Sequence, residues 1–339
     1  SERYRPRRML AVDNILDREY FRTVLPALKA SHRGLQLFYE TKANLTKEQV
    51  RLLKEAGVVG IQPGIESLST PILRLMRKGT TALQNVQLLK WAREAGLQVS
   101  WNLLMGFPGE DPAEYARMAG MVPALIHLQP PRHCCLISLQ RFSPYFYQRE
   151  ALGVCNVRPL VAYRAVYPFP DEDLAQLAYF FNYDYLDGRD PLTYVLPLAE
   201  TVAAWQEETG AGLAYSGTGE ALLVRDARGP AVTWVRLRGP QCAVYEFCDE
   251  AHTLPAIEAQ AQRACGEPGG IEAGLPGDDP AGAVELEGLR EGKYSHRGLE
   301  RLLAELVDLR LMLCDDGHYL SLAIRDHGEM GAGAASGRP

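Results

Sequence analysis

Short apolar runs alternate with stretches of helical periodicity through the first half of the chain. Between the runs, apolar residues recur every three or four positions, as in amphipathic helices. Strand-length apolar runs separated by such helices are typical of parallel βα units with right-handed crossovers. We therefore expect an α/β protein in which residues 1–190 form a partial (β/α) barrel of the TIM type or a doubly wound sheet. The predicted strands are residues 8–12, 35–42, 58–67, 97–105 and 132–139.

The pattern changes after about residue 191. Residues 146–190 are rich in Tyr, Phe and Pro and are predicted to be a transition with one helix at 171–181. Beyond it, helices followed by a two-stranded hairpin predict a winged-helix-like α+β module at 191–326. We expect a mobile loop at 265–282, which is rich in Gly, Pro, Asp and Glu, and a disordered tail at 327–339. The predicted helices are 198–209, 241–250, 253–264 and 296–308, and the predicted hairpins are 221–225 with 232–237 and 311–314 with 318–324.

Composition narrows the possible partners. The 339 residues carry a net charge of −6, with a pI near 5.7, which argues against nucleic acid or an anionic membrane as a general partner. No apolar run reaches transmembrane length. Seven cysteines without regular spacing indicate reduced thiols, so we expect a cytoplasmic protein.

Four segments at or after the ends of the predicted strands resemble the later half of a radical SAM barrel of the cobalamin-associated type. Over residues 4–325 the chain is similar to radical SAM enzymes that mature ribosomally synthesised peptides (RiPPs), such as bacteriocins. The segments are Gly64–Ser67, Leu73–Gly79, Asn102–Glu110 and Arg141–Tyr145.

The resemblance implies the chemistry. In this family a [4Fe-4S] cluster gives one electron to S-adenosylmethionine (SAM), and the resulting 5′-deoxyadenosyl radical attacks an unactivated C–H bond. Cobalamin-associated members commonly transfer a methyl group to carbon. The implied partners are a precursor peptide and an electron donor protein, and the C-terminal module is expected to help dock the peptide, by strand addition at its hairpins.

One motif of the family is missing from this sequence. No Cys-x3-Cys-x2-Cys occurs: Cys134 and Cys135 are adjacent, and Cys242 and Cys248 lie in the second predicted domain. An iron–sulfur cluster needs thiolate ligands. We expect the first barrel strand, its cysteine loop and any cobalamin domain to lie ahead of Ser1, so this chain alone is expected to be inactive.

The resemblance also implies residues that bind SAM. Asp13 and Asn14 stand where the second family strand meets the SAM amino group, and the alternative is a turn before a helix. Glu40 and Lys42 alternate to one face of their strand and match the third-strand contacts of the family. Their alternative is a salt bridge on a sheet face.

The remaining candidates follow the later strands. Glu66 and Ser67 are the strongest, as ribose or methionyl ligands, with helix capping by Ser67 or Ser69 as the alternative. Asn102 interrupts an apolar strand, where an unpaired amide is costly, so we expect it to contact the ribose; the alternative is a core asparagine satisfied by the backbone. Arg141 is expected to face the site or to pair with an acid.

Two rival interpretations remain. One is a non-catalytic peptide-binding module that has lost the cluster. The other is a TIM-like hydrolase or aldolase, but the sequence offers no convincing Ser-His-Asp set, no His-rich cluster, and no Schiff-base lysine with more support than Lys42.

Overall fold

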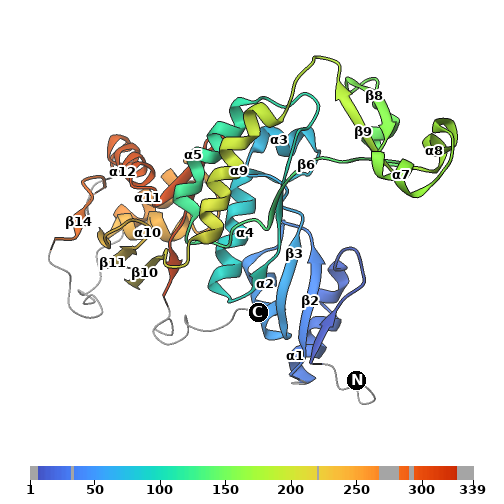
Figure 1. Cartoon of the computed structure of the whole chain (residues 1–339). Coiled ribbons are helices and arrows are strands. Elements are labelled where there is room, and N and C mark those ends of the chain that lie inside the picture. Colours follow the sequence, from blue (N-terminus) through green and yellow to red (C-terminus); the bar gives the residue numbers. More distant parts are fainter. Residues whose placement is uncertain (1–6, 32–33, 220, 267–281, 290–293, 327–339) are drawn as a thin grey trace.

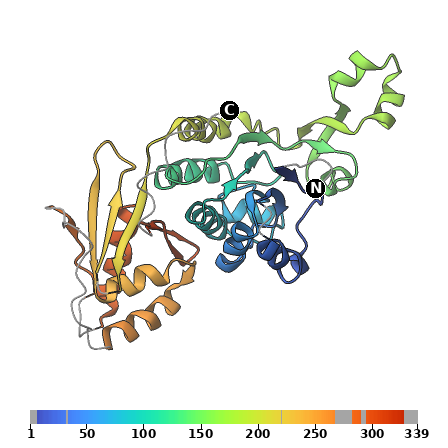
Figure 2. The same cartoon turned by 90° about the horizontal axis from the view of Figure 1, so that it is seen from below.

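The computed structural model describes residues 7–31, 34–219, 221–266, 282–289 and 294–326. Within these residues the chain has three parts: a parallel sheet with its helices, a lobe at residues 139–185 that projects away from it, and a C-terminal module (Figures 1 and 2). The predicted loop at 265–282 falls almost wholly outside the described residues, and so does the predicted tail at 327–339.

The N-terminal part is built on parallel strands in the order of the sequence. Four strands pair as β1-β2-β3-β4, and β5 pairs in parallel with β6. A parallel bridge between Glu66 and Leu103 places β5 beside the end of β3. The five predicted strands are therefore confirmed, with the fourth divided into β4 and β5. The strands are β1 (Arg8–Leu10), β2 (Gln36–Thr41), β3 (Val58–Pro63), β4 (Gln98–Val99), β5 (Asn102–Met105) and β6 (His133–Leu136).

Helices connect these strands and lie in a row, since α1 contacts α2 and α2 contacts α4. Capping boxes at Thr46 and Thr81 start α2 and α4. Pro26 lies in the first turn of α1, where a proline is tolerated, and the short helix η1 ends ahead of it. The helices are η1 (Arg18–Phe21), α1 (Val24–Ser31), α2 (Lys47–Glu55), α3 (Thr70–Leu75), α4 (Ala82–Glu94) and α5 (Ala113–Leu125).

Helix α9 (Leu192–Glu207) packs along α5, as both views show (Figures 1 and 2). The rings of Trp205 and Trp101 pack edge to face, with their centroids 6.1 Å apart. The indole nitrogen of Trp205 donates to the Leu128 carbonyl at 3.2 Å. These buried contacts tie α9 to the first part of the chain. The domain boundary at residue 190 stays a prediction; α9, which follows it, packs against α5 of the sheet part.

The projecting lobe corrects the predicted transition segment. Its strands form a small antiparallel sheet in the order β7-β9-β8, over a separate core of Leu139, Val154, Ala178 and Phe181. The helix predicted to reach residue 181 ends at Leu177, and the aromatic run after it forms a strand, as aromatic residues favour. The elements are β7 (Leu139–Gln140), α6 (Pro144–Tyr147), β8 (Val154–Pro159), α7 (Val161–Val166), α8 (Asp171–Leu177) and β9 (Phe180–Tyr185).

The C-terminal module contains two sheets, in the orders β14-β12-β11-β10-β17 and β13-β16-β15. Both predicted hairpins are present, whereas β10 was not predicted. From α10 to β16 the order is helix, short strand, helix, short strand, helix and hairpin; the winged-helix-like character stays a prediction. The elements are β10 (Leu213–Thr218), β11 (Ala221–Asp226), β12 (Thr233–Arg238), α10 (Pro240–Phe247), β13 (His252–Thr253), α11 (Leu254–Gly266), β14 (Val284–Glu285), α12 (His296–Asp308), β15 (Met312–Asp315), β16 (His318–Ser321) and β17 (Ile324–Arg325).

A buried lysine joins the C-terminal module to the sheet part. Lys90 of α4 has no exposed surface. Its ammonium group lies 2.9 Å from the Asp249 carboxylate and donates to the carbonyls of Asp249 at 2.9 Å and Ser321 at 2.7 Å. The same carboxylate accepts from Lys47 at 2.9 Å and from the Trp91 indole at 3.0 Å. A buried charge needs such partners to be tolerated.

Candidate functional site

A strained turn follows β3 at the carboxyl end of the sheet. Glu66 has a φ of 61°, and the Ser67 amide donates to the Ile65 carbonyl at 2.7 Å. A hydrogen bond between residues i and i+2 around a positive φ is the mark of the rarer, strained γ-turn. A non-glycine residue in this region costs about 1–3 kcal/mol and is concentrated at functional sites. The turn therefore singles out Glu66.

The Glu66 carboxylate lies next to a lysine that follows α3. The ammonium group of Lys78 is 3.3 Å from the nearer Glu66 oxygen, and both side chains are partly exposed. Gly64 makes this approach possible, because a Cβ there would lie 2.9 Å from the lysine nitrogen. The strand end thus offers a carboxylate and an ammonium group side by side, which suits a zwitterionic ligand.

The buried amide of Asn85 holds the same turn from α4. Its nitrogen donates to the carbonyls of Ile65 at 3.0 Å and Ser67 at 2.9 Å. The Glu66 carbonyl between them accepts from the Leu104 amide of β5 at 2.9 Å. All three carbonyls of the turn are thereby hydrogen-bonded to neighbouring elements.

Asn102 lies on β5 beside this turn, because Glu66 forms a bridge with Leu103. Its side-chain oxygen is buried and accepts no hydrogen bond from the part of the chain that the structure describes. An unsatisfied buried acceptor costs about 1–3 kcal/mol. A hydroxyl or amino group of a bound ligand would satisfy it.

The loop after β5 is fixed by Glu110, which is 2% exposed. Its carboxylate accepts from the amides of Gly106 at 3.1 Å and Phe107 at 2.7 Å, and from the hydroxyls of Tyr115 at 2.5 Å and Tyr194 at 2.7 Å. Burial raises the pKa of Tyr115, and its bond to Glu110 raises it further, so the phenol stays a donor. Nothing in the sequence of the loop indicated that its own glutamate anchors it.

Glu40 and Lys42 come from the neighbouring strand. Glu40 pairs in register with Gln62 of β3, and both are exposed on the face of the sheet that alternates with the buried Leu37 and Thr41. Lys42 follows β2 and lines a cavity of about 890 Å³ that η1 and the start of α2 also line. These two residues therefore lie one strand away from Glu66.

Asp13 and Asn14 are exposed in the segment between β1 and η1. Burial raises the pKa of Tyr39, and the nearby Tyr20 and Asp13 raise it further. Tyr39 alternates to the face opposite Glu40. The SAM-binding role of Asp13 and Asn14 stays a prediction.

Ser67 does not join the group around Glu66. Ser67 is fully buried, and its hydroxyl donates to the Met118 sulfur at 3.6 Å and accepts from the Ser69 amide at 3.1 Å. Successive side chains at a strand end point to opposite faces, so Ser67 points to the helix layer when Glu66 points away from it. We therefore leave Ser67 out of the ligand set. Ser69 caps α3, as the alternative reading held.

Arg141 lies in the projecting lobe after β7 and not at the end of a parallel strand. Its guanidinium donates to the carbonyls of Ala175 and, at 2.6 Å, Ala178. The group also lies over the rings of Phe146 and Phe181 at 5.4 and 5.1 Å. It braces the lobe and pairs with carbonyls instead of an acid, which corrects both expectations for it.

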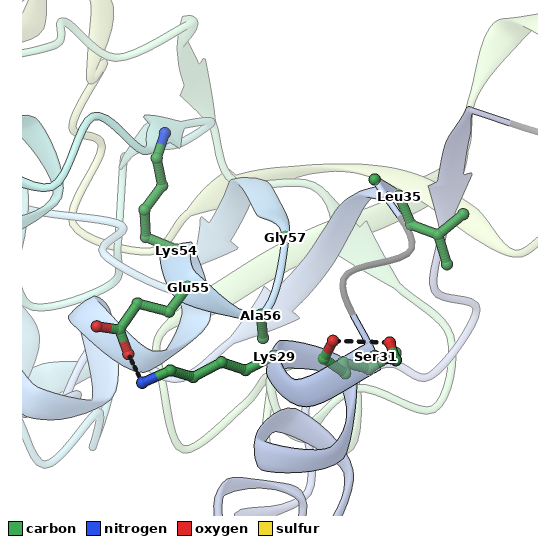
Figure 3. Close-up of a pocket in the computed structure, with 9 residues that line it drawn as sticks. Lys29, Ser31, Leu35, Lys54, Glu55, Ala56 and Gly57 are labelled. Carbon is green, nitrogen blue, oxygen red and sulfur yellow. Dashed lines mark hydrogen bonds and ion pairs between the residues drawn. The ribbon is translucent and has the colours of Figure 1, made fainter.

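A second hollow, of about 480 Å³, lies at the opposite, amino-terminal end of β2 and β3 (Figure 3). Lys29 and Glu55 form an ion pair of 2.9 Å on its rim, with both side chains about half exposed. Functional groups of α/β proteins collect at the carboxyl ends of the strands. We therefore expect no SAM binding in this hollow, so its residues can serve as controls in a binding experiment.

The cysteines of this chain do not fit a [4Fe-4S] cluster. All seven are free, and the described residues contain no group of three or more His, Cys, Asp or Glu side chains able to hold a metal. Burial raises the pKa of the Cys134 thiol to about 11 and those of Cys242 and Cys248 to about 12. Such thiols are protonated at neutral pH, whereas a cluster needs thiolates.

The parallel α/β fold with a strained polar turn at its strand ends defines a class of protein that binds ligands at that edge. Within that class, the sequence profile of the Radical SAM superfamily matches residues 4–122. This superfamily implies SAM and a [4Fe-4S] cluster as cofactors. The predicted superfamily is thus confirmed over that segment, while the cobalamin-associated and peptide-maturing types stay predictions.

Two curated proteins are similar over short segments. A tRNA uridine(34) acetyltransferase of Methanocaldococcus infernus is 27% identical over 81 residues, which are 24% of this chain and 15% of that protein. An uncharacterised methyltransferase of Pyrococcus horikoshii is 32% identical over 87 residues, which are 25% of this chain and 19% of that protein. The match thus spans less than a fifth of the length of either relative.

Solved structures of radical SAM enzymes are similar at low identity. The methyltransferase TsrM of Kitasatospora setae, solved with cobalamin and a [4Fe-4S] cluster bound, has a TM-score of 0.40 and 15% identity, over 59% of this chain and 42% of that one. Coproporphyrinogen III oxidase of Escherichia coli has a TM-score of 0.36 and 11% identity, over 90% of this chain and 71% of that one.

Proposed function

We propose that this chain binds SAM at the carboxyl ends of β3 and β5, as part of a radical SAM enzyme. The observation that carries the proposal is the strained turn at Glu66, which lies next to the strand that bears the unsatisfied oxygen of Asn102. Both residues lie in the segment that matches the superfamily. Strain and an orphaned acceptor both cost stability, and a ligand that uses them offsets that cost.

Each side chain has a role that its chemistry supports. The Glu66 carboxylate accepts hydrogen bonds from the ribose hydroxyls or the amino group of SAM, and Lys78 holds that carboxylate in place. Asn102 accepts from a ribose hydroxyl. Lys42 offers a cation for the SAM carboxylate, and Glu40 an acceptor on the same strand. When bound to a reduced cluster, SAM supplies radical chemistry; the cluster does not fit the cysteines of this chain, so no step is derived through it.

Binding of SAM to the chain tests the proposal without requiring turnover. Isothermal titration with SAM is expected to show about tenfold weaker binding for Glu66→Gln and Asn102→Leu, the loss expected for one hydrogen bond to a charged or buried group. Glu55→Gln is the matched control, since it changes a carboxylate paired with a lysine at the other end of the sheet. Equal affinity in all variants, or no binding by the unaltered chain, would overturn the proposal.

We further propose that the substrate is a ribosomally synthesised precursor peptide and that an electron donor protein is needed. The support lies in β15, which stands at the edge of its three-stranded sheet and can accept an added strand. Cobalamin-dependent C-methylation belongs to the same proposal. Fluorescence anisotropy with small peptides encoded beside this gene tests it. The amide of Cys314 faces the open edge of β15, because its pair with Tyr319 is a non-hydrogen-bonded one. Binding that Cys314→Pro abolishes supports strand addition, and unchanged binding contradicts it.

The second candidate is a peptide-binding module without radical chemistry, which the scattered, protonated thiols favour. The SAM titration separates the two candidates. Peptide binding without SAM binding would establish the module, and SAM binding that depends on Glu66 would exclude it.

A further inference from the structure

Asn85 is a fully buried amide whose two hydrogen bonds go to backbone carbonyls on either side of Glu66. It lies in the first half of α4, which begins after the Thr81 capping box. The distances are 3.0 Å to the Ile65 carbonyl and 2.9 Å to the Ser67 carbonyl. One rigid side chain therefore spans the turn that carries Glu66.

The other end of the same amide is unsatisfied. The Asn85 side-chain oxygen is buried and has no hydrogen-bond partner among the residues that the structure describes. A leucine of similar volume would avoid this cost, but it would leave the buried carbonyls of Ile65 and Ser67 without their donor, which costs about 1–3 kcal/mol for each acceptor left unsatisfied. The asparagine is thus poorly explained by packing and well explained by its two donor bonds.

The turn needs such a brace. Glu66 has a φ of 61°, which L side chains rarely adopt, and a turn closed only by the bond from Ser67 to Ile65 could relax to an ordinary strand end. Asn85 binds the outer two carbonyls, and the Leu104 amide binds the middle one. In this arrangement the Glu66 side chain stays beside Lys78, and the Glu66 backbone stays paired with β5 at Leu103.

We infer that Asn85 is a positioning residue for ligand binding: it holds Glu66 in the left-handed conformation that presents its carboxylate to SAM. The identity of the ligand in this inference rests on the proposed function. The bracing of the turn by Asn85 does not depend on it. Preorganisation of a binding group raises affinity, because the ligand need not supply the ordering.

The test combines Asn85→Leu with a double-mutant cycle on the whole chain. Asn85→Leu is expected to weaken SAM binding about tenfold when Glu66 is present, and less than about twofold further in a Glu66→Gln background, since the two residues act through one contact. Gln241→Leu is the control: it removes a buried amide that donates to the Leu286 and Gly288 carbonyls in the C-terminal module. It should lower stability and leave SAM affinity unchanged.

Hydrogen exchange measures the turn independently of SAM. The amides of Ser67 and Leu104 close the turn, so both should exchange faster in Asn85→Leu than in Gln241→Leu. Unchanged exchange overturns the inference, as does SAM affinity that falls equally with and without Glu66. If the unaltered chain binds no SAM, the proposed function fails, and the exchange rates alone decide whether Asn85 holds Glu66.

Discussion

Replacing Lys90 with methionine removes the buried charge that joins α4 to the C-terminal module. Methionine keeps the length and apolar stem of the side chain, so packing changes little. The change leaves the Asp249 carboxylate with Lys47 and the Trp91 indole, and it leaves the carbonyls of Asp249 and Ser321 without the lysine donor. We expect the free energy of unfolding to fall.

The size of the loss follows from the contacts. Removing one partner of a buried pair costs about 3–5 kcal/mol. Burial works to raise the pKa of Asp249, but Lys90 and Lys47 outweigh it and lower the pKa to about 2. Against an ordinary value of about 3.9, this fall corresponds to about 2.5 kcal/mol shared between two lysines. With Lys47 still in place, we expect Lys90→Met to cost about 3 kcal/mol.

Urea unfolding followed by tryptophan fluorescence measures this loss, because Trp91 contacts Asp249 directly. Burial lowers the pKa of Lys90 despite the attraction of Asp249, so lost hydration offsets much of the gain from the pair. The double variant Lys90→Met with Asp249→Leu should therefore recover to within about 1 kcal/mol of the unaltered chain. A single variant within about 0.5 kcal/mol of it, or a double variant less stable than the single, would refute the reasoning.

Three further predictions concern other parts of the chain. Glu110→Ala should cost about 3 kcal/mol because four donors lose their acceptor, whereas Tyr194→Phe removes one bond and should cost about 1 kcal/mol; thermal unfolding that shows equal losses would contradict this. The lowered pKa of Asp249 stabilises the fold above pH about 3.9, and this stability should be lost as the pH falls toward 2; urea midpoints between pH 6 and 3 should fall less in Asp249→Asn. Arg141→Met should speed proteolysis within residues 139–185 without changing SAM affinity; a loss of affinity would return Arg141 to the binding site.

Much of the fold was predictable because its signals are local. The five parallel strands are apolar runs bounded by polar residues, and α12 matches its prediction because Ser295 caps an amphipathic stripe. The lobe was missed because β7 has only two residues and because pairing between distant segments determines β8 and β9. Nothing in the local pattern of residues 154–159 indicates their partner.

The candidate site was predictable where it coincided with strand ends. Glu66 and Asn102 are brought together by the pairing of neighbouring strands, which the order of the motifs implied. Lys78 and Asn85 reach the same turn from helix-associated positions, and only the packing of α3 and α4 on the sheet brings them there. The segment Leu73–Gly79 was the sequence signal that includes Lys78.

The lobe at residues 139–185 leaves and rejoins the chain at nearly the same place. A Cβ built on Gly106 would lie 3.3 Å from Leu136, just before the lobe, and 3.4 Å from Pro191, just after it. A short linker from Leu136 to Pro191 could therefore replace the lobe without moving β6 or α9, at the cost of the bond from Tyr185 to the Gly106 carbonyl. The lobe is in this sense a self-contained insertion, whose removal should leave the ends of β5 and β6 in place.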